Sequence, residues 1–351
     1  MSNKNETKKI TSIGGSALIE GIMMRGPKKN TVAVRTADGG IYTEDINMKF
    51  LSQSSKFWRL PLIRGVSGMI DSMRLSYKSL MISADKAMEG AEEEETSKDK
   101  KKKDSKKAEK APEVKEEKTE ENKEDKENEK ESSGVLMKIL MVVSSLIGVG
   151  LAILLFFFLP TWIFGLLGMA FPVLAKGGEG IAFWQSVIEG ILKIVIFISY
   201  ILIISMTPDM KRVFQYHGAE HKTIFCYENE LELTPENVMK MKRFHPRCGT
   251  SFILLMLLVG IIIGLFIPKG MFLRPLIKIL LLPLTMGIGY ELIKFCGRHD
   301  NKLTRIIAAP GLWAQRVTTK EPDEKMCEIA IAAIEAVIPD DGSDIVKNGC
   351  C

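Results

Sequence analysis

The residues most able to carry chemistry lie in one stretch, Gln215 to Phe252, which is flanked by two long apolar segments. Three of the four histidines of the chain fall inside it, at His217, His221 and His245. His217 and His221 are four positions apart, so on a helix their imidazole rings project from one face, one turn apart. Two imidazole nitrogens placed in this way can share a transition-metal ion. The stretch is therefore a candidate metal site.

An acidic residue and a cysteine complete the set. Glu220 precedes His221, which makes residues 217–221 an instance of H-x-x-E-H, the pattern of the inverted zinc peptidases. In such sites a carboxylate can act as general base toward water. Cys248 follows three positions after His245, a short spacing that is typical of zinc ligands. We expect the three histidines and Cys248 to bind zinc, with Glu220 as the catalytic residue.

The alternative for these residues is an ordinary helix surface. The H-x-x-E-H pattern is short enough to occur by chance, and Gly218 lowers the helix propensity that the geometry requires. Against this, a chain with few histidines gathers them at the boundary of an apolar segment, with a cysteine at ligand spacing. A metal site is the favoured interpretation, and the sequence leaves open whether it is catalytic or structural.

Three further charged residues are candidates outside this stretch. Glu20 and Arg25 lie in a glycine-bracketed apolar segment, where they can face a ligand or the metal site. The favoured interpretation is structural: the two side chains pair with each other or contact water, because structural ion pairs outnumber functional ones. Glu291 lies inside an apolar segment, and an ionisable group within a membrane span usually faces protein or water. It is a competitor of His245 or Cys248 for the metal.

The composition separates charged and apolar parts sharply. Of 351 residues, 46% are hydrophobic and 26% are charged. Residues 89–133 are almost entirely polar or charged, so they cannot bury enough surface to offset the entropy of ordering, and a disordered linker is expected. Acidic side chains alternate with the lysines in this linker, which leaves no basic stripe to neutralise phosphates. No nucleic-acid partner is expected.

Four apolar segments predict transmembrane helices, which makes the lipid bilayer the main expected partner. They are Val135 to Leu159, Val187 to Met206, Ser251 to Ile267 and Met271 to Phe295. Pro160 is expected to end the first helix, and residues 161–175 to lie at the membrane interface or to re-enter. The last segment contains two prolines, which a membrane helix can tolerate with a kink.

Basic residues near the spans predict their orientation. Lysines and arginines are frequent between the second and third spans and after the fourth, whereas the opposite side offers only Lys176, Lys269 and Arg274. Because cytoplasmic loops carry the excess of Lys and Arg, both termini and the histidine stretch are expected in the cytoplasm. Cysteines in that compartment are expected to be reduced thiols that can bind metal.

The remaining segments show the periods of both strand and helix. Residues 31–36 and 40–47, joined by an Asp-Gly-Gly step, predict a β-hairpin. Residues 62–88 predict an amphipathic helix whose methionine-rich stripe either packs on the hairpin or lies on the membrane surface. A short periodic helix is expected over residues 326–338. The predicted fold is an α-helical membrane protein with about four transmembrane helices and a small α+β cytoplasmic N-terminal domain.

Four regions follow from these patterns: the N-terminal domain with its amphipathic helix, the linker, the four-span membrane domain, and a C-terminal cytoplasmic helical segment. They cover residues 1–88, 89–133, 134–296 and 297–351, and the cytoplasmic His/Cys loop within the membrane domain covers residues 207–250.

Four motifs resemble those of the YqhQ-like family of bacterial membrane proteins. They are residues 14–27, 216–228, 243–252 and 310–337, which read GGSALIEGIMMRGP, YHGAEHKTIFCYE, RFHPRCGTSF and PGLWAQRVTTKEPDEKMCEIAIAAIEAV. The resemblance covers nearly the whole chain apart from the charged linker. It implies a multi-pass protein of the bacterial plasma membrane. The family is mostly of unknown function and is sometimes described as predicted metal-dependent enzymes, so the resemblance supplies no substrate.

Three classes of function are compatible with these features. The first is a metal-dependent hydrolase in which Glu220 is the general base. The second is a membrane scaffold or accessory factor, for example in membrane-protein biogenesis, whose zinc site is structural and whose partners include other membrane proteins. The third and weakest is a transporter, which Glu291 and the prolines of the fourth span favour. The sequence leaves the oligomeric state open.

Overall fold

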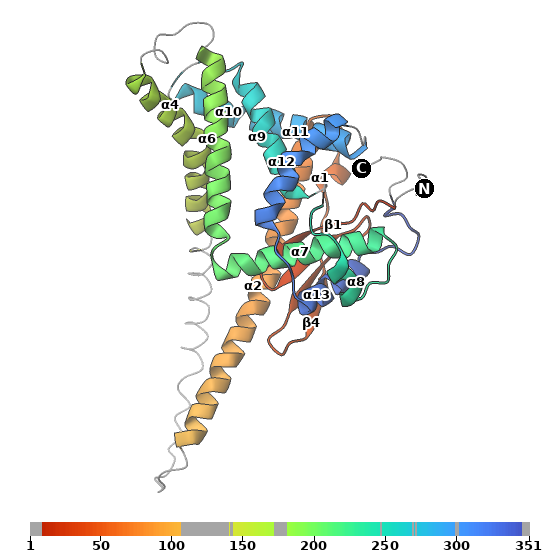
Figure 1. Cartoon of the computed structure of the whole chain (residues 1–351). Coiled ribbons are helices and arrows are strands. Elements are labelled where there is room, and N and C mark those ends of the chain that lie inside the picture. The colour runs from red at the N-terminus through yellow and green to blue at the C-terminus, as the bar shows by residue number, and fades with distance from the viewer. Residues whose placement is uncertain are drawn as a thin grey trace.

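The structure, a computed structural model, describes residues 9–106, 140, 143–171, 181–245, 248–268, 270, 272–298 and 302–345. Helices dominate it, and one small sheet lies near the N-terminus (Figure 1). The strands are β1 Gly14–Leu18, β2 Gly21–Arg25, β3 Asn30–Arg35 and β4 Ile41–Asp45. The α-helices are α1 Leu51–Ser54, α2 Ile63–Lys106, α4 Leu159–Ala170, α6 Ile181–Ile204, α7 Pro208–Glu228, α8 Pro235–Lys240, α9 Gly249–Gly264, α10 Leu273–Leu280, α11 Leu282–Arg298, α12 Lys302–Thr318 and α13 Glu324–Glu335. A 3-10 helix, η1 Lys56–Arg59, and a π-helical segment, η2 Leu154–Phe158, complete the set.

The sheet is an antiparallel meander in the order β1-β2-β3-β4. The predicted hairpin is confirmed as β3 and β4, whose register pairs Arg35 with Ile41. Gly39 has a φ of 84°, a left-handed conformation that suits glycine and lets the chain reverse within four residues. The turn is closed by a hydrogen bond from the Thr36 N–H to the Gly40 carbonyl at 3.1 Å.

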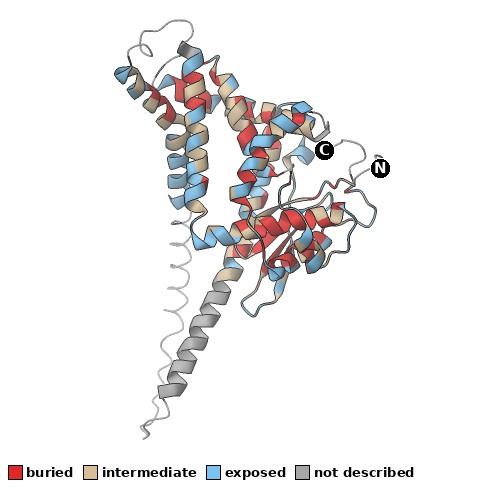
Figure 2. Cartoon of the chain, viewed as in Figure 1, coloured by how far each residue is buried: buried red, intermediate tan, exposed pale blue. Residues whose placement is uncertain are grey.

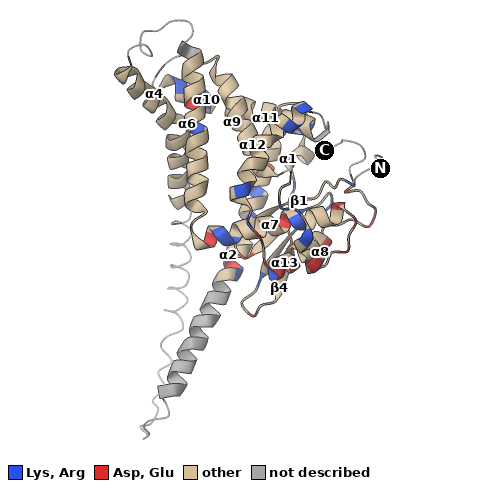
Figure 3. Ribbon diagram, viewed as in Figure 1, with Lys and Arg blue, Asp and Glu red and all other residues tan. Residues whose placement is uncertain are grey.

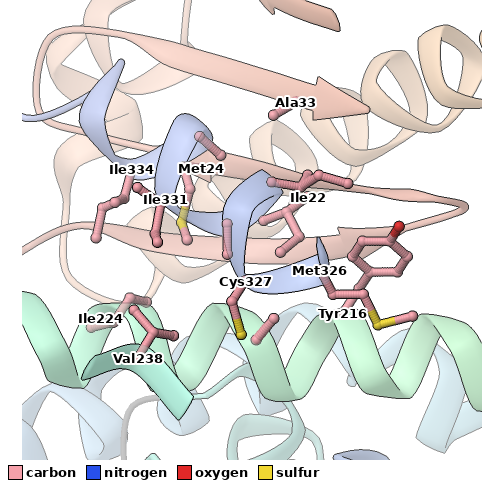
Figure 4. Packing of buried hydrophobic residues seen from close by; sticks show 14 of the residues in the cluster. Ile22, Met24, Ala33, Tyr216, Ile224, Val238, Met326, Cys327, Ile331 and Ile334 are labelled. Atoms are coloured by element: carbon pink, nitrogen blue, oxygen red, sulfur yellow. The ribbon is translucent and has the colours of Figure 1, made fainter. Parts of the chain in front are cut away.

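One face of the sheet forms a hydrophobic core with helices from distant parts of the chain (Figure 4). Ile22 and Met24 of β2 pack there with Tyr216 of α7 and with Met326 and Ile334 of α13. Because strand residues alternate between the two faces of a sheet, every second apolar residue of β2 reaches this core. The predicted helix over residues 326–338 is present as α13. The sheet, the histidine helix and the C-terminal helix therefore share one core.

The opposite face of the sheet packs against α2. Leu75 of α2 contacts a cluster that includes Val32 and Val34, and it is 1% exposed. The predicted helix is present, but its methionine-rich stripe does not face the sheet, since Met73 and Tyr77 are 64% and 59% exposed. Small residues face the sheet instead. One of them is the buried Ser83, which donates to the Ile19 carbonyl between β1 and β2, and Leu75 and Ile82 pack on the sheet beside it. Small side chains allow a helix to approach a sheet more closely than methionines do.

Helix α2 extends into the predicted linker. It continues to Lys106, so the backbone of the first part of that linker is helical. Glu and Lys are frequent in this stretch, and both have high helix propensity. Residues 107–133 of the predicted linker lie outside the described residues.

Two helices in the described part of the chain are long and apolar enough to cross a membrane, Val143–Ala170 and Phe183–Ile204. Only 11% and 17% of their most apolar windows are buried, and Figure 2 shows the exposed surface of α4 and α6. The bent pair of α10 and α11 is a third candidate if it forms a single span. Large exposed apolar surfaces of this kind are compatible with a membrane protein.

The predicted count of four spans is not confirmed. The first helix continues past Pro160 to Ala170, because a proline is tolerated in the first turn of a helix and the π-helical segment directly precedes α4. Helix α9 has 16 residues, which is short for a span, and α10 and α11 meet at an angle of 50°. The first residues of the first predicted span and the last of residues 161–175 lie outside the described residues.

The shared core predicts unequal effects of two identical substitutions. Met326→Ala removes a side chain that is 1% exposed, whereas Met73→Ala removes one that is 64% exposed. We expect Met326→Ala to lower the free energy of unfolding by about 2–5 kcal/mol, since it leaves a cavity. Met73→Ala should change it by less than about 0.5 kcal/mol. Denaturant unfolding in detergent, followed by intrinsic fluorescence, measures both, and equal effects would contradict the core described above.

Candidate metal centre

Helix α7 carries three of the predicted site residues. It begins at Pro208, with Asp209 in its first turn, and both residues favour a helix start. Gly218, which lowers helix propensity, does not interrupt it. A Cβ atom at Gly218 would lie 2.0 Å from the carbonyl oxygen of Lys320, whose own N–H donates to the Phe214 carbonyl at 2.8 Å. Glycine is required there because the chain after α12 crosses α7 in backbone contact.

The structure brings three of the four predicted ligands together. Ligand atoms of His217, His221 and Cys248 all lie within 4.8 Å of one another. The two imidazole centroids are 4.4 Å apart, and His217 Nε2 is 3.1 Å from Cys248 Sγ. Two nitrogens and a sulfur at these distances form a group that can hold a transition-metal ion. We refer to these three residues as the His-His-Cys group.

Both imidazole rings are fixed by backbone carbonyls on their other nitrogen. His217 Nδ1 is 2.8 Å from the carbonyl oxygen of Thr318, and His221 Nδ1 is 2.5 Å from that of Arg243. A carbonyl oxygen only accepts, so each Nδ1 carries the proton and each Nε2 keeps its lone pair. This arrangement is usual for histidines that bind metal, because it fixes the tautomer and the ring orientation.

Cys248 reaches the group from the start of α9. It is the residue before the helix and is 8% exposed, and its sulfur accepts from the Thr250 N–H at 3.5 Å. The group therefore joins α7 to α9.

Glu220 is buried on the same helix as the two histidines, and its carboxylate contacts β1. It is 4% exposed, and its Oε1 accepts from the Gly15 N–H of β1 at 3.0 Å. Its Oε2 has no hydrogen-bond partner among the described residues. Burial raises the pKa of Glu220, and His217 together with the Gly15 N–H offsets part of this effect. An unpaired carboxylate oxygen in a buried site can accept a proton or a ligand atom.

His245 lies next to the group but points elsewhere. Its ring centroid is 5.7 Å from that of His221, and its Nε2 is 3.6 Å from Glu228 Oε2. Its backbone is held by Gln315, whose side chain accepts from its N–H at 2.8 Å and donates to its carbonyl at 2.7 Å. The structure does not place His245 in the His-His-Cys group. Its role as a metal ligand stays a prediction.

Glu20, Arg25 and Glu291 lie in other contacts. Glu291 binds Arg64 of α2 through both carboxylate oxygens, so it is engaged away from the His-His-Cys group. Glu20 forms an ion pair with Arg212 at the start of α7. The structural pair expected between Glu20 and Arg25 is therefore replaced by a pair with α7. The Arg25 guanidinium lies 4.6 Å from the ring centroid of Phe50.

Sequence reasoning misses a second set of charged residues. Glu189 of α6 and Arg274 and Lys278 of α10 are buried together, although the sequence places Arg274 among the flanking charges of a span. Their signal in the sequence is the presence of charges inside or beside apolar segments. The same rule selects Glu291, which the structure pairs with Arg64.

Comparisons with known proteins identify the family of the chain. The chain belongs to the family described as "Protein of unknown function (DUF1385)", whose model matches residues 60–340. It is also similar to the "Uncharacterized protein YqhQ" of Bacillus subtilis (strain 168), with 32% identity over 327 residues, which is 93% of this chain and 92% of that protein. The family resemblance of the four motifs is thus confirmed. No solved structure matches the chain.

Gly218 provides a test of the geometry. Gly218→Ala should force the Lys320 backbone away from α7, lower the free energy of unfolding by about 1–3 kcal/mol and reduce the metal content of the purified protein. Gly260→Ala, in α9, is the matched control because a Cβ atom there meets nothing within 4 Å. Thermal unfolding and metal analysis measure the two effects. Equal stability and equal metal content in both variants would show that the close approach is not required.

Proposed function

We propose that this protein is a multi-pass protein of the bacterial plasma membrane with a zinc site on its cytoplasmic side, and that this site catalyses a hydrolysis. The observation that carries the proposal is the His-His-Cys group, together with the buried Glu220 on the same helix, whose Oε2 has no partner among the described residues. Three protein ligands leave a tetrahedral ion one position for water or substrate, as in catalytic zinc sites. The basic residues of the segment around α7 support the cytoplasmic orientation.

The residues of the site have separate roles in this reaction. His217 presents Nε2 toward Cys248 Sγ, and Thr318 and Arg243 accept from Nδ1 of His217 and His221, which leaves Nε2 of both rings for the metal. A zinc ion bound there supplies Lewis-acid chemistry to water and to the substrate oxygen. Glu220 Oε2 accepts the proton of water while the water oxygen bonds to the carbonyl carbon of an amide or the phosphorus of a phosphoester. The bond to the leaving nitrogen or oxygen breaks, and Glu220 returns the proton to it.

A structural zinc site is the second candidate, and two observations favour it. His221 and Cys248 are 1% and 8% exposed, and the group joins α7 to the start of α9. His245 is near enough to rotate toward His221 and complete four ligands, which would leave no position for water. In that case the protein is a scaffold or accessory factor for other membrane proteins. Transport loses its main support, since Glu291 is paired with Arg64.

Metal analysis distinguishes an open site from a closed one. We expect about one equivalent of zinc in the detergent-purified protein and none in His217→Ala or His221→Ala, because each removes one of three ligands. His245→Ala should retain the metal if three ligands suffice. Loss of zinc in His245→Ala would identify the structural site, and absence of stoichiometric metal from the wild type would reject both candidates. Inductively coupled plasma mass spectrometry gives the metal content.

The role of Glu220 is tested separately. Glu220→Gln should keep the zinc but lower hydrolysis by at least about 100-fold, because the amide cannot accept the proton. The measurement is turnover of a panel of amide and phosphoester substrates by the purified protein, with metal content determined on the same samples. If a substrate is found and Glu220→Gln turns it over at the wild-type rate, Glu220 is not the general base.

A further inference from the structure

A group of charged side chains lies inside the apolar helical part of the molecule, away from the His-His-Cys group. Glu189 of α6 and Arg274 and Lys278 of α10 are 1%, 0% and 8% exposed. Arg274 Nε is 3.0 Å from Glu189 Oε2, and Lys278 Nζ donates to the same oxygen. Figure 3 shows blue and red ribbon where α10 lies beside α6. The patch is surrounded by uncharged ribbon.

The two basic side chains of α10 differ in their hydrogen bonds. Arg274 also donates to the Gly264 carbonyl at 3.0 Å, to Ser186 Oγ at 2.6 Å and to the carbonyls of Ile267 and Pro268. Its guanidinium donors are therefore occupied by protein atoms, and they close the C-terminal end of α9. Lys278 has three N–H donors, and Glu189 is the acceptor that it contacts.

Lys193 adds a third positive charge one helical turn after Glu189. Its Nζ lies 5.2 Å from the ring centroid of Phe157 in η2, and it lies within electrostatic range of Lys278, Glu189 and Arg274. Among the residues that the structure describes, no hydrogen-bond acceptor is found for its ammonium group. An ammonium near the middle of an apolar helix requires a counter-charge, because aromatic contact alone compensates little of its lost hydration.

The charges of this group do not balance. Glu189 pairs with Arg274 and Lys278, and Lys193 lies within electrostatic range of all three, so basic side chains outnumber acidic ones here. A buried excess charge is costly unless an ion of opposite sign neutralises it. No second acid is found here among the described residues, and a bound anion would keep both lysine side chains charged.

Two irregularities of the helices meet at the same place. The π-helical segment η2 carries Phe157, and α10 ends at Leu280, two residues after Lys278, where the chain bends by 50° into α11. Both π-helical segments and broken membrane helices are frequent at ligand sites, because they open the regular packing and expose backbone groups. The irregular backbone and the excess charge thus coincide.

We propose that Lys193 and Lys278 bind a phosphate group at the junction of α6, α10 and η2. A phosphate carries one or two negative charges and several acceptor oxygens, which match two ammonium groups with unused donors. A phospholipid headgroup and soluble phosphate share this chemistry. The site is independent of the zinc centre, and phosphate binding there does not require the protein to be a hydrolase.

The test compares the wild type with Lys193→Gln and with Lys211→Gln, an exposed residue of α7 that serves as the charge-matched control. The full-length proteins are purified in a zwitterionic detergent, and thermal unfolding is followed during titration with inorganic phosphate or phosphatidylglycerol. Chloride at equal ionic strength and phosphatidylcholine are the control additions. Stabilisation of the wild type and of Lys211→Gln is expected with at least one probe. Lys193→Gln should require about tenfold more of that probe, as expected for the loss of one charged hydrogen bond.

The outcomes separate the sources and can reject the site. Stabilisation by phosphatidylglycerol alone identifies a lipid headgroup, and stabilisation by inorganic phosphate identifies a soluble ligand. If neither probe stabilises the protein more than chloride or phosphatidylcholine does, or if Lys193→Gln responds as the wild type does, the proposal is overturned. Lys193→Gln breaks no hydrogen bond among the described residues, so it should fold and keep its metal. Lys278→Arg retains the charge and should still bind the probe that stabilises the wild type, so a complete loss of response in Lys278→Arg also rejects the site.

Discussion

The packing of α7 against its neighbours on several sides is the constraint on which the rest of the structure depends. Tyr216 and Ile224 bury one side of the helix in the core with β2 and α13. On another side Gly218 lies in contact with the Lys320 backbone, which leaves no room for even a methyl group. A helix held in this way cannot rotate about its axis without breaking either contact. The direction in which His217 and His221 point is therefore set by packing.

Buried polar groups around α7 then fix the side chains themselves. The carbonyls of Thr318 and Arg243 belong to segments that are distant in sequence, and both orient imidazole rings. Gly15 of β1 holds one oxygen of Glu220 and leaves the other without a partner among the described residues. Ligands that are oriented before the metal arrives lose less conformational entropy on binding. The sheet, which is remote from the histidines in sequence, is thus part of the site.

The apolar helices are connected to α7 and the sheet domain at two places. Cys248 places the start of α9 at the His-His-Cys group, and the Arg64–Glu291 pair joins α2 to α11. Farther along α9, Arg274 closes the C-terminal end of the same helix and is neutralised by Glu189. Both ends of α9 are thereby bound by polar contacts, while much of the surface of α4 and α6 stays apolar and exposed.

The sequence by itself determined the local features of this protein. The spacing of His217 and His221, the turn at Gly39 and the period of α13 depend on neighbours within a few residues, so each could be predicted from the chain alone. The family followed from four motifs in order. The apolar segments also indicated helices, although Pro160 misplaced the end of the first one, because its effect depends on whether it falls in a first turn.

Only the tertiary structure decided which of these features meet. It brought Cys248 to the two histidines, turned His245 toward Glu228, and engaged Glu291 with Arg64. It also turned Met73 of α2 outward, because small residues on the other side fit the sheet more closely. Contacts between segments separated by dozens of residues depend on how whole elements pack, and spacing within one segment does not contain that information. For the same reason the charge imbalance around Glu189 became visible only when α6 and α10 were placed side by side.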